Sequence, residues 1–230
     1  EKCYVYPYSG LNFGKSYSFT VTPYIENNGY KYKCKTSALT YCTIADYVAV
    51  ESITAKEEYV INIGETKDIV ANSETEGATR PEFVWNIKNN LIANIVTNTT
   101  TTAEVKGLKA GITQLEIIAN DEDCYYISPK IIVLPESVGT LKTDVYDMNK
   151  IKLSWNAVAD AYGYNVYRKL ASDSEWKLVT STSNTVYDDS DLEYQTEYMY
   201  KVCAYVENGN NKYEGASIEK SEATKEAVFG

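Results

Sequence analysis

The chain of 230 residues contains no histidine. Histidine is the commonest general base near neutral pH and the commonest metal ligand, so its absence removes both roles together. Carboxylates, lysines, tyrosines and five cysteines are left for any chemistry. We therefore expect a protein that is not an enzyme and that needs no metal ion or cofactor.

Arginine and long apolar runs are also scarce. Only Arg80 and Arg168 occur, and 32 acidic against 22 basic side chains give a net charge of −10. Because affinity for nucleic acid is built from clustered cations, we expect no nucleic-acid partner. No apolar run approaches the ~20 residues that span a bilayer, so we expect no membrane insertion in this segment. Residues 1–10 lack a secretory signal, which leaves an intracellular chain or a mature piece of an exported protein.

Short alternating runs rich in Val, Ile, Thr and Tyr recur along the chain, with turn residues between them. Period-two alternation at this spacing is typical of antiparallel β-sandwiches. We therefore predict an all-β fold of tandem sandwiches. The runs expected as strands are 17–21, 59–63, 104–108, 114–119, 130–134, 150–155, 164–169 and 197–205.

An internal repeat shows that part of the chain is duplicated. A shift of 181 positions without gaps aligns residues 5–32 with residues 186–213, and 11 of those 28 positions are identical. About two identities are expected by chance at average composition. In both copies a leucine precedes a tyrosine by six residues (Leu11 and Tyr17, Leu192 and Tyr198), and alternation follows. This pattern predicts a tyrosine corner, in which the ring packs at the end of a sandwich and its hydroxyl binds upstream backbone.

Residues 135–230 contain four motifs, in the order KIKLSWNAVADAYGYNVYRK, SEWKLV, TVYDD and LEYQTEYMYKVCAYVENG. By these motifs the segment resembles a fibronectin type III domain. The resemblance implies that Trp155 is the core tryptophan and Tyr198 the corner tyrosine. Residues 1–45 then match the C-terminal half of such a domain, without a counterpart of residues 136–181. We expect strands from another chain, or from a swap, to complete this half.

Residues 46–134 contain the turn Gly64-Glu65-Thr66, Trp85 at an inward position, and GLKAG at residues 107–111. By these motifs the segment resembles a bacterial immunoglobulin-like domain of group 2. The resemblance implies a large exported bacterial surface protein, and therefore an extracellular or cell-surface location.

The five cysteines do not suggest a set of disulfide bonds. Cys124 and Cys203 are each alone in their predicted domains, and Cys34 and Cys42 are expected on one extended strand, too far apart to pair. Two alternatives stay open, a bridge between Cys3 and Cys34 or unpaired thiols.

Acidic clusters at residues 121–123 and at Asp188, Asp189 and Asp191 are interpreted as solvated turns, with a calcium site as the alternative. Glu193 and Glu197 have the residue types of a glycosidase pair, but the pattern predicts no cleft between them. Asn98 begins a glycosylation sequon that has meaning only in a eukaryotic host.

The 22 tyrosines are about three times ordinary usage. Trp176, Tyr30, Tyr32 and Tyr213 are candidates for ligand-binding aromatics, because they fall in predicted loops or hairpin tips. The alternative is that most tyrosines are half-exposed strand residues. The residues expected in the core are Trp85, Trp155, Tyr17, Tyr198, Leu11 and Leu192.

The leading functional hypothesis is a non-catalytic spacer or adhesive stalk, with other modules of the same polypeptide as partners. Short junctions near residues 43–48 and 134–138, without Gly/Ser runs, favour a semi-rigid rod. The alternatives are a module that binds a cell-surface glycan or a host protein, accessory domains of an exported hydrolase, and decoration of a phage virion.

Overall fold

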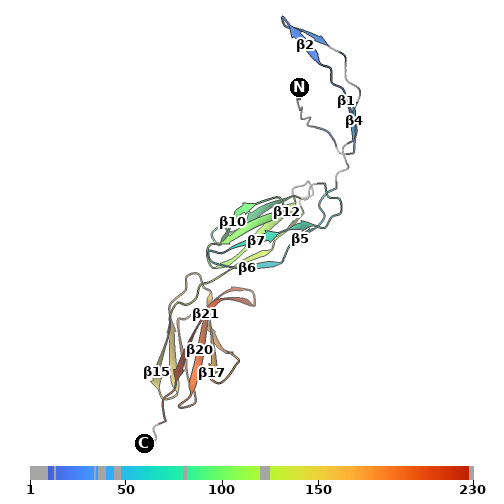
Figure 1. Cartoon of the computed structure of the whole chain (residues 1–230). Coiled ribbons are helices and arrows are strands. Elements are labelled where there is room, and N and C mark those ends of the chain that lie inside the picture. The colour runs from blue at the N-terminus through green and yellow to red at the C-terminus, as the bar shows by residue number, and fades with distance from the viewer. Residues whose placement is uncertain are drawn as a thin grey trace.

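A computed structural model describes residues 10–12, 14–33, 35, 40–43, 48–79, 82–119 and 125–227. These residues contain strands and no helix, which confirms the all-β prediction. Two ribbons are followed by two β-sandwiches arranged end to end (Figure 1). The part of the chain that the structure describes holds no helix long and apolar enough to cross a membrane.

The first unit consists of two antiparallel ribbons. Strand β1 (Ser16–Phe19) pairs with β4 (Thr40–Thr43), and β2 (Tyr24–Asn27) pairs with β3 (Tyr30–Lys33). The two-residue turn between β2 and β3 has positive φ angles at Asn28 (51°) and Gly29 (80°). Asparagine and glycine tolerate these angles best, which is why they are typical of tight hairpins.

The middle unit is a sandwich with its own core. One sheet has the order β10–β11–β7, and the other has β13–β12–β14–β6 with β9 also paired to β12. Strands β14 and β6 are parallel. The bounds are β5 (Ile53–Thr54), β6 (Glu58–Asn62), β7 (Thr66–Val70), β8 (Asn72–Ser73), β9 (Phe83–Ile87), β10 (Ala93–Asn98), β11 (Thr102–Gly107), β12 (Gly111–Ala119), β13 (Tyr126–Ile127) and β14 (Lys130–Leu134).

Alternating side chains of these strands fill the middle core. Leu115, Ile117 and Ile131 are fully buried, and each such side chain stabilises the fold by about 1.5–3 kcal/mol. Trp85 is 6% exposed and its indole Nε1 donates to the Thr99 carbonyl at 3.1 Å. Gly107 ends β11 where a Cβ would lie 2.6 Å from the Asn62 carbonyl oxygen, so the close approach of these strands requires glycine.

The last unit is a second sandwich. The sheet β15–β16–β19 packs against the sheet β18–β17–β20–β21. The bounds are β15 (Leu141–Asp147), β16 (Lys150–Trp155), β17 (Gly163–Leu170), β18 (Lys177–Thr182), β19 (Val186–Asp189), β20 (Glu197–Asn208) and β21 (Asn211–Ala223). Trp155, 7% exposed, packs edge-on against Tyr164 with ring centroids 5.5 Å apart.

The tyrosine corner occurs in both repeat copies. The Tyr17 hydroxyl accepts from the Asn12 amide at 2.8 Å, and the Tyr198 hydroxyl accepts from the Glu193 amide at 3.0 Å. Residues 12 and 193 differ by the same 181 positions as the two tyrosines. The duplication seen in the sequence is therefore reproduced as local structure.

The two corners differ in burial. Leu192 and Tyr198 are 5% and 6% exposed and belong to the core of the last sandwich. Leu11 and Tyr17, predicted as core, are only half-buried. Among the described residues β1 pairs with β4 alone, whereas β20 lies between two strands and under a second sheet.

Candidate functional site

The junction between the two sandwiches is built from side chains of both. Ala110 and Ile132 of the middle unit form a small buried cluster with Val206 of β20. Ile63, Ile112, Leu134 and Tyr213 are partly buried around it. These aliphatic side chains remove apolar surface from water on both sides, so the contact favours one relative placement.

Polar contacts surround this cluster. The Tyr213 hydroxyl donates to Glu58 Oε2 at 2.8 Å, across 155 positions of sequence. Lys109 Nζ lies 2.8 Å from Asp160 Oδ1. A side hollow of about 400 Å³ is lined by Asn208 of the hairpin tip together with residues of β12 and β14. The candidate binding residue Tyr213 therefore contacts the neighbouring sandwich.

The linker itself is held against β21. Residues 135–137 connect β14 to Val138, which is 1% exposed in the core of the last unit. A Cβ at Gly215 would lie 2.0 Å from the Pro135 carbonyl oxygen. The register of β20 and β21 shifts between Cys203 and Tyr205, beside this glycine. Glycine and the irregular pairing together make room for the linker.

Trp176 lies next to two ammonium groups. The Nζ atoms of Lys169 and Lys201 are each 5.1 Å from its ring centroid, and Lys201 Nζ is 4.5 Å from the ring of Tyr167. Such contacts stabilise a cation over an aromatic face. Trp176 is half-buried in this ladder of alternating lysines and rings. The ladder differs from the open aromatic platform that the sequence suggested.

The other aromatic candidates lie on the hairpin of β2 and β3, here called the first hairpin. Tyr30 is 72% exposed at the start of β3. Tyr32 lies on the same strand, and its side chain is outside the described residues. Tyr30 belongs to the ribbon of β2 and β3, whereas Trp176 directly precedes β18 of the last sandwich.

Asp189 takes part in a buried ion pair. Arg168 Nη1 donates to its two carboxylate oxygens at 2.7 and 2.8 Å, and the Tyr200 hydroxyl donates to Oδ2 at 2.8 Å. Asp189 is 3% exposed. Burial alone would lower the pKa of Arg168, but the hydrogen bond and charge of Asp189 outweigh it and raise that pKa. The prediction of a solvated turn or calcium loop is wrong for Asp189, because its oxygens connect the two sheets.

The remaining acidic candidates are dispersed. Asp188, Asp191, Glu193 and Glu197 are exposed, and residues 121–123 lie outside the described residues. No group of three or more Cys, Asp or Glu side chains in the described ranges could hold a metal ion. Cys3, Cys34 and Cys124 also lie outside those ranges, so the pairing of Cys3 with Cys34 stays a prediction. The single extended strand expected to carry Cys34 and Cys42 also falls partly outside the described residues, where β3 ends at Lys33 and β4 begins at Thr40.

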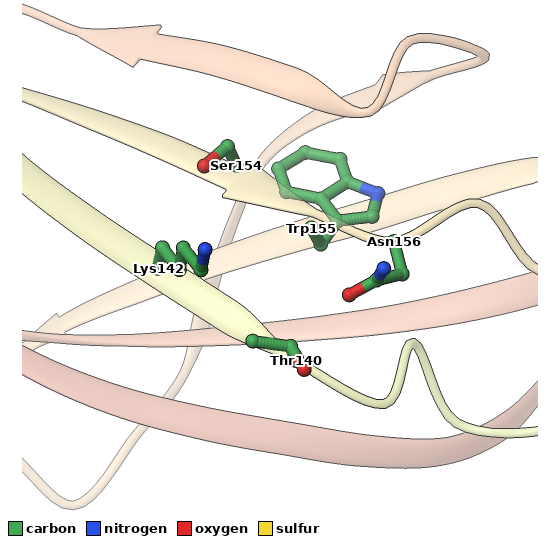
Figure 2. Close-up of a pocket in the computed structure, with 5 residues that line it drawn as sticks. All are labelled: Thr140, Lys142, Ser154, Trp155 and Asn156. Atoms are coloured by element: carbon green, nitrogen blue, oxygen red, sulfur yellow. The ribbon is translucent and has the colours of Figure 1, made fainter.

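A small hollow adjoins the core tryptophan. Figure 2 shows it between β15 and β16, lined by Thr140, Lys142, Ser154, Trp155 and Asn156. Its volume of about 150 Å³ is below the ~300 Å³ at which small-molecule sites begin. The buried Nε1 of Trp155 has no hydrogen-bond partner among the described residues. The hollow is too small to favour a ligand site.

No protein-family model matches the chain, and no curated protein does either. Among solved structures, domains A168–A170 from titin are 17% identical, with 87% of this chain and 72% of that chain covered at a TM-score of 0.34. The structure called FN3tt mut is 24% identical over 40% of this chain and 99% of its own, at 0.34. The chicken CNTN1 FN1–FN3 domains are 13% identical over 91% and 76%, at 0.35.

The strand order of the last sandwich decides its fold class by itself. Its first, second and fifth strands form one sheet, and its third, fourth, sixth and seventh strands form the other. Residues 138–227 are a fibronectin type III-like sandwich. This arrangement places the hairpin of β20 and β21 at the end that faces the middle unit (Figure 1).

A polar cluster on this fibronectin type III-like sandwich surrounds Glu214. Its Oε1 accepts from Asn165 Nδ2 and from the Tyr167 hydroxyl, each at 2.5 Å. Cys203 is 3% exposed beside them. Burial raises the pKa of the Cys203 thiol to about 12, and the Glu214 charge adds to the shift.

We expect the Cys203 thiol to be nearly inert in the folded protein. At pH 8 its thiolate fraction, and therefore its alkylation rate with iodoacetamide, should be about 1,000-fold below that of a free cysteine. The rate should rise about tenfold per pH unit while the fold persists, because only the thiolate reacts. Peptide-level mass spectrometry measures it, with guanidinium-unfolded protein as the control. A folded-state rate within tenfold of the unfolded one would contradict the expectation.

Proposed function

We propose that this chain is a non-catalytic spacer, a semi-rigid stalk segment of an exported bacterial surface protein. The observation that carries the proposal is the junction between the sandwiches. Three linker residues, an apolar cluster and the contact of Tyr213 with Glu58 hold the two modules together. Modules joined by long Gly/Ser linkers would reorient freely, whereas this linker is short and packed.

The bacterial setting rests on motifs of the middle module. The turn Gly64-Glu65-Thr66 precedes β7, and the GLKAG segment joins β11 to β12. Both motifs are those that suggested a group 2 immunoglobulin-like domain. An extracellular or cell-surface location and partners within the same longer polypeptide follow from that resemblance and are part of the proposal.

A rigid junction predicts a narrow distance distribution between the modules. Spin labels at Val70 and Leu178, which are 49% and 48% exposed, report on the middle and last sandwiches respectively. The labelled protein carries cysteine at these two positions and serine at 3, 34, 42 and 124. Pulsed electron paramagnetic resonance should give one narrow peak. A broad distribution would contradict the spacer proposal, because freely turning modules cannot project a distal domain at a fixed angle.

The ladder at Trp176 favours a second candidate, binding of an anionic glycan. Two ammonium groups and the rings of Trp176 and Tyr167 lie together on the outer face of the four-stranded sheet. Stacking on aromatic rings and charge pairing with lysine are the contacts that such a glycan would use. An array of sulfated and sialylated glycans tests it, with Lys201→Gln expected to abolish any binding.

A further inference from the structure

The hairpin of β2 and β3 repeats the hairpin tip of β20 and β21 in backbone register. Asn27 pairs with Tyr30 and Glu26 with Lys31. The second copy has the pairs Asn208 with Asn211 and Glu207 with Lys212. Each pair in one copy is 181 positions from its counterpart in the other. The register therefore places equivalent residues at equivalent points of both tips.

A side-chain contact is repeated as well. Lys31 Nζ lies 4.4 Å from the ring centroid of Tyr24, and Lys212 Nζ lies 4.5 Å from that of Tyr205. The tyrosine corners that precede the two hairpins are also equivalent. The two tips thus share strand register and a lysine–tyrosine contact, whereas below them Tyr17 pairs with Cys42, one residue beyond the partner that the register of the second copy would give.

The second tip is an interdomain contact element. Val206 packs on Ala110 and Ile132, and its register partner Tyr213 donates to Glu58. The corresponding register pair in the first hairpin is Ile25 with Tyr32. An aliphatic residue and a tyrosine thus stand at the two positions that make the known junction.

The first tip lies at the end of the molecule away from the middle sandwich (Figure 1). Tyr24 and Tyr30 are 50% and 72% exposed there. Lys31 and Lys33 give β3 a positive charge, and residues 1–48 carry five basic and three acidic side chains. Residues 49–137 carry seven basic and fourteen acidic ones, so the charge of a module of that kind complements the hairpin.

We propose that the β2–β3 tip is a docking surface for an immunoglobulin-like module whose end matches that of the middle sandwich. At the register positions of Val206 and Tyr213 the tip carries Ile25 and Tyr32. These are the residue types that match an apolar patch equivalent to Ala110 and Ile132 and a carboxylate equivalent to Glu58. The inference rests on the proposed spacer function, and it identifies the type of module that the first hairpin contacts.

The test uses residues 46–134 as an isolated module, which retains the complete middle core. It is titrated into the ¹⁵N-labelled full chain while the amides of Glu26, Gly29 and Lys31 are followed by NMR. Interdomain contacts resemble transient interfaces, so we expect saturable shifts with a dissociation constant of ~1 mM or below.

Matched variants separate docking from non-specific contact. Ile25→Asp in the full chain and Glu58→Lys in the module should each weaken binding at least tenfold, while Leu178→Asp in the full chain should leave it unchanged. The spectrum of each variant shows whether it is folded. Unmoved hairpin amides at 2 mM module, or shifts that survive both substitutions, would overturn the inference. The spacer proposal is tested independently by the distance distribution between the spin labels. It would stand if that distribution is narrow, and it would fail if that distribution is broad.

Discussion

Replacement of Asp189 by alanine is expected to lower the free energy of unfolding of residues 138–227 by about 3–5 kcal/mol. The substitution removes the acceptor that the Arg168 guanidinium and the Tyr200 hydroxyl share. Tyr200 is fully buried, and the Arg168 side chain is 28% exposed. A buried charge without a partner loses its compensation and keeps its desolvation penalty. Chemical denaturation followed by tryptophan fluorescence measures the change.

Two further variants show whether the ion pair is the cause. Tyr200→Phe removes one hydrogen bond and should cost about 1 kcal/mol. Arg168→Met combined with Asp189→Ala leaves no unpaired charge, so the double variant should be more stable than Asp189→Ala alone. Burial and the Asp189 charge raise the pKa of Tyr200, so its hydroxyl remains a donor at neutral pH. A loss below 1 kcal/mol for Asp189→Ala would show that the pair does not stabilise the contact between the sheets.

Val206→Asp should separate the two sandwiches without unfolding either. Val206 is 4% exposed and belongs to the junction cluster, outside both main cores. Retaining the junction would bury a carboxylate among aliphatic side chains at a cost of several kcal/mol. Opening the junction exposes only a few such side chains, so the open form should dominate. The distance distribution between labels at Val70 and Leu178 should then broaden strongly.

The control for this experiment is Val186→Asp. Val186 is 39% exposed on β19 and takes no part in the junction cluster. The Val186→Asp substitution introduces the same charge into the same sandwich, and the distance distribution between the labels should stay narrow. In the Val206→Asp protein, the free energy of unfolding of each sandwich, measured by chemical denaturation, should stay within about 1 kcal/mol of its value in the original protein. A narrow distribution in that protein would mean that the linker alone fixes the angle.

Strands were the most predictable part of the fold. Residues 130–134 and 150–155, expected as strands from their alternation, are β14 and β16. Alternation succeeds here because one side of each strand faces a core and the other faces water or the neighbouring module. The run 17–21 was predicted too long, since β1 ends at Phe19. Its twin strand in the last sandwich continues because it has a neighbour on each side.

Side-chain roles that depend on distant residues were not predictable. Asp189 looked like one member of an acidic turn, because its partner Arg168 comes from another strand of the opposite sheet. Tyr213 looked like a loop aromatic for an external ligand, yet its hydroxyl reaches Glu58 in the neighbouring sandwich. The sequence around Trp176 did not indicate that Lys201 contacts its ring. Pairing of β17 with both β18 and β20 brings these two side chains together.

The sequence by itself determined the all-β class, the repeat at 181 positions and the tyrosine corners. These features depend on local periodicity and on contacts five residues apart, which the order of residues encodes directly. The tertiary structure alone decided that the two sandwiches share an apolar junction, that Asp189 is buried, and that the tip of the β20–β21 hairpin supplies contact residues of that junction. The physical reason is that burial and pairing depend on which distant strands meet, and only the folded chain brings those strands together.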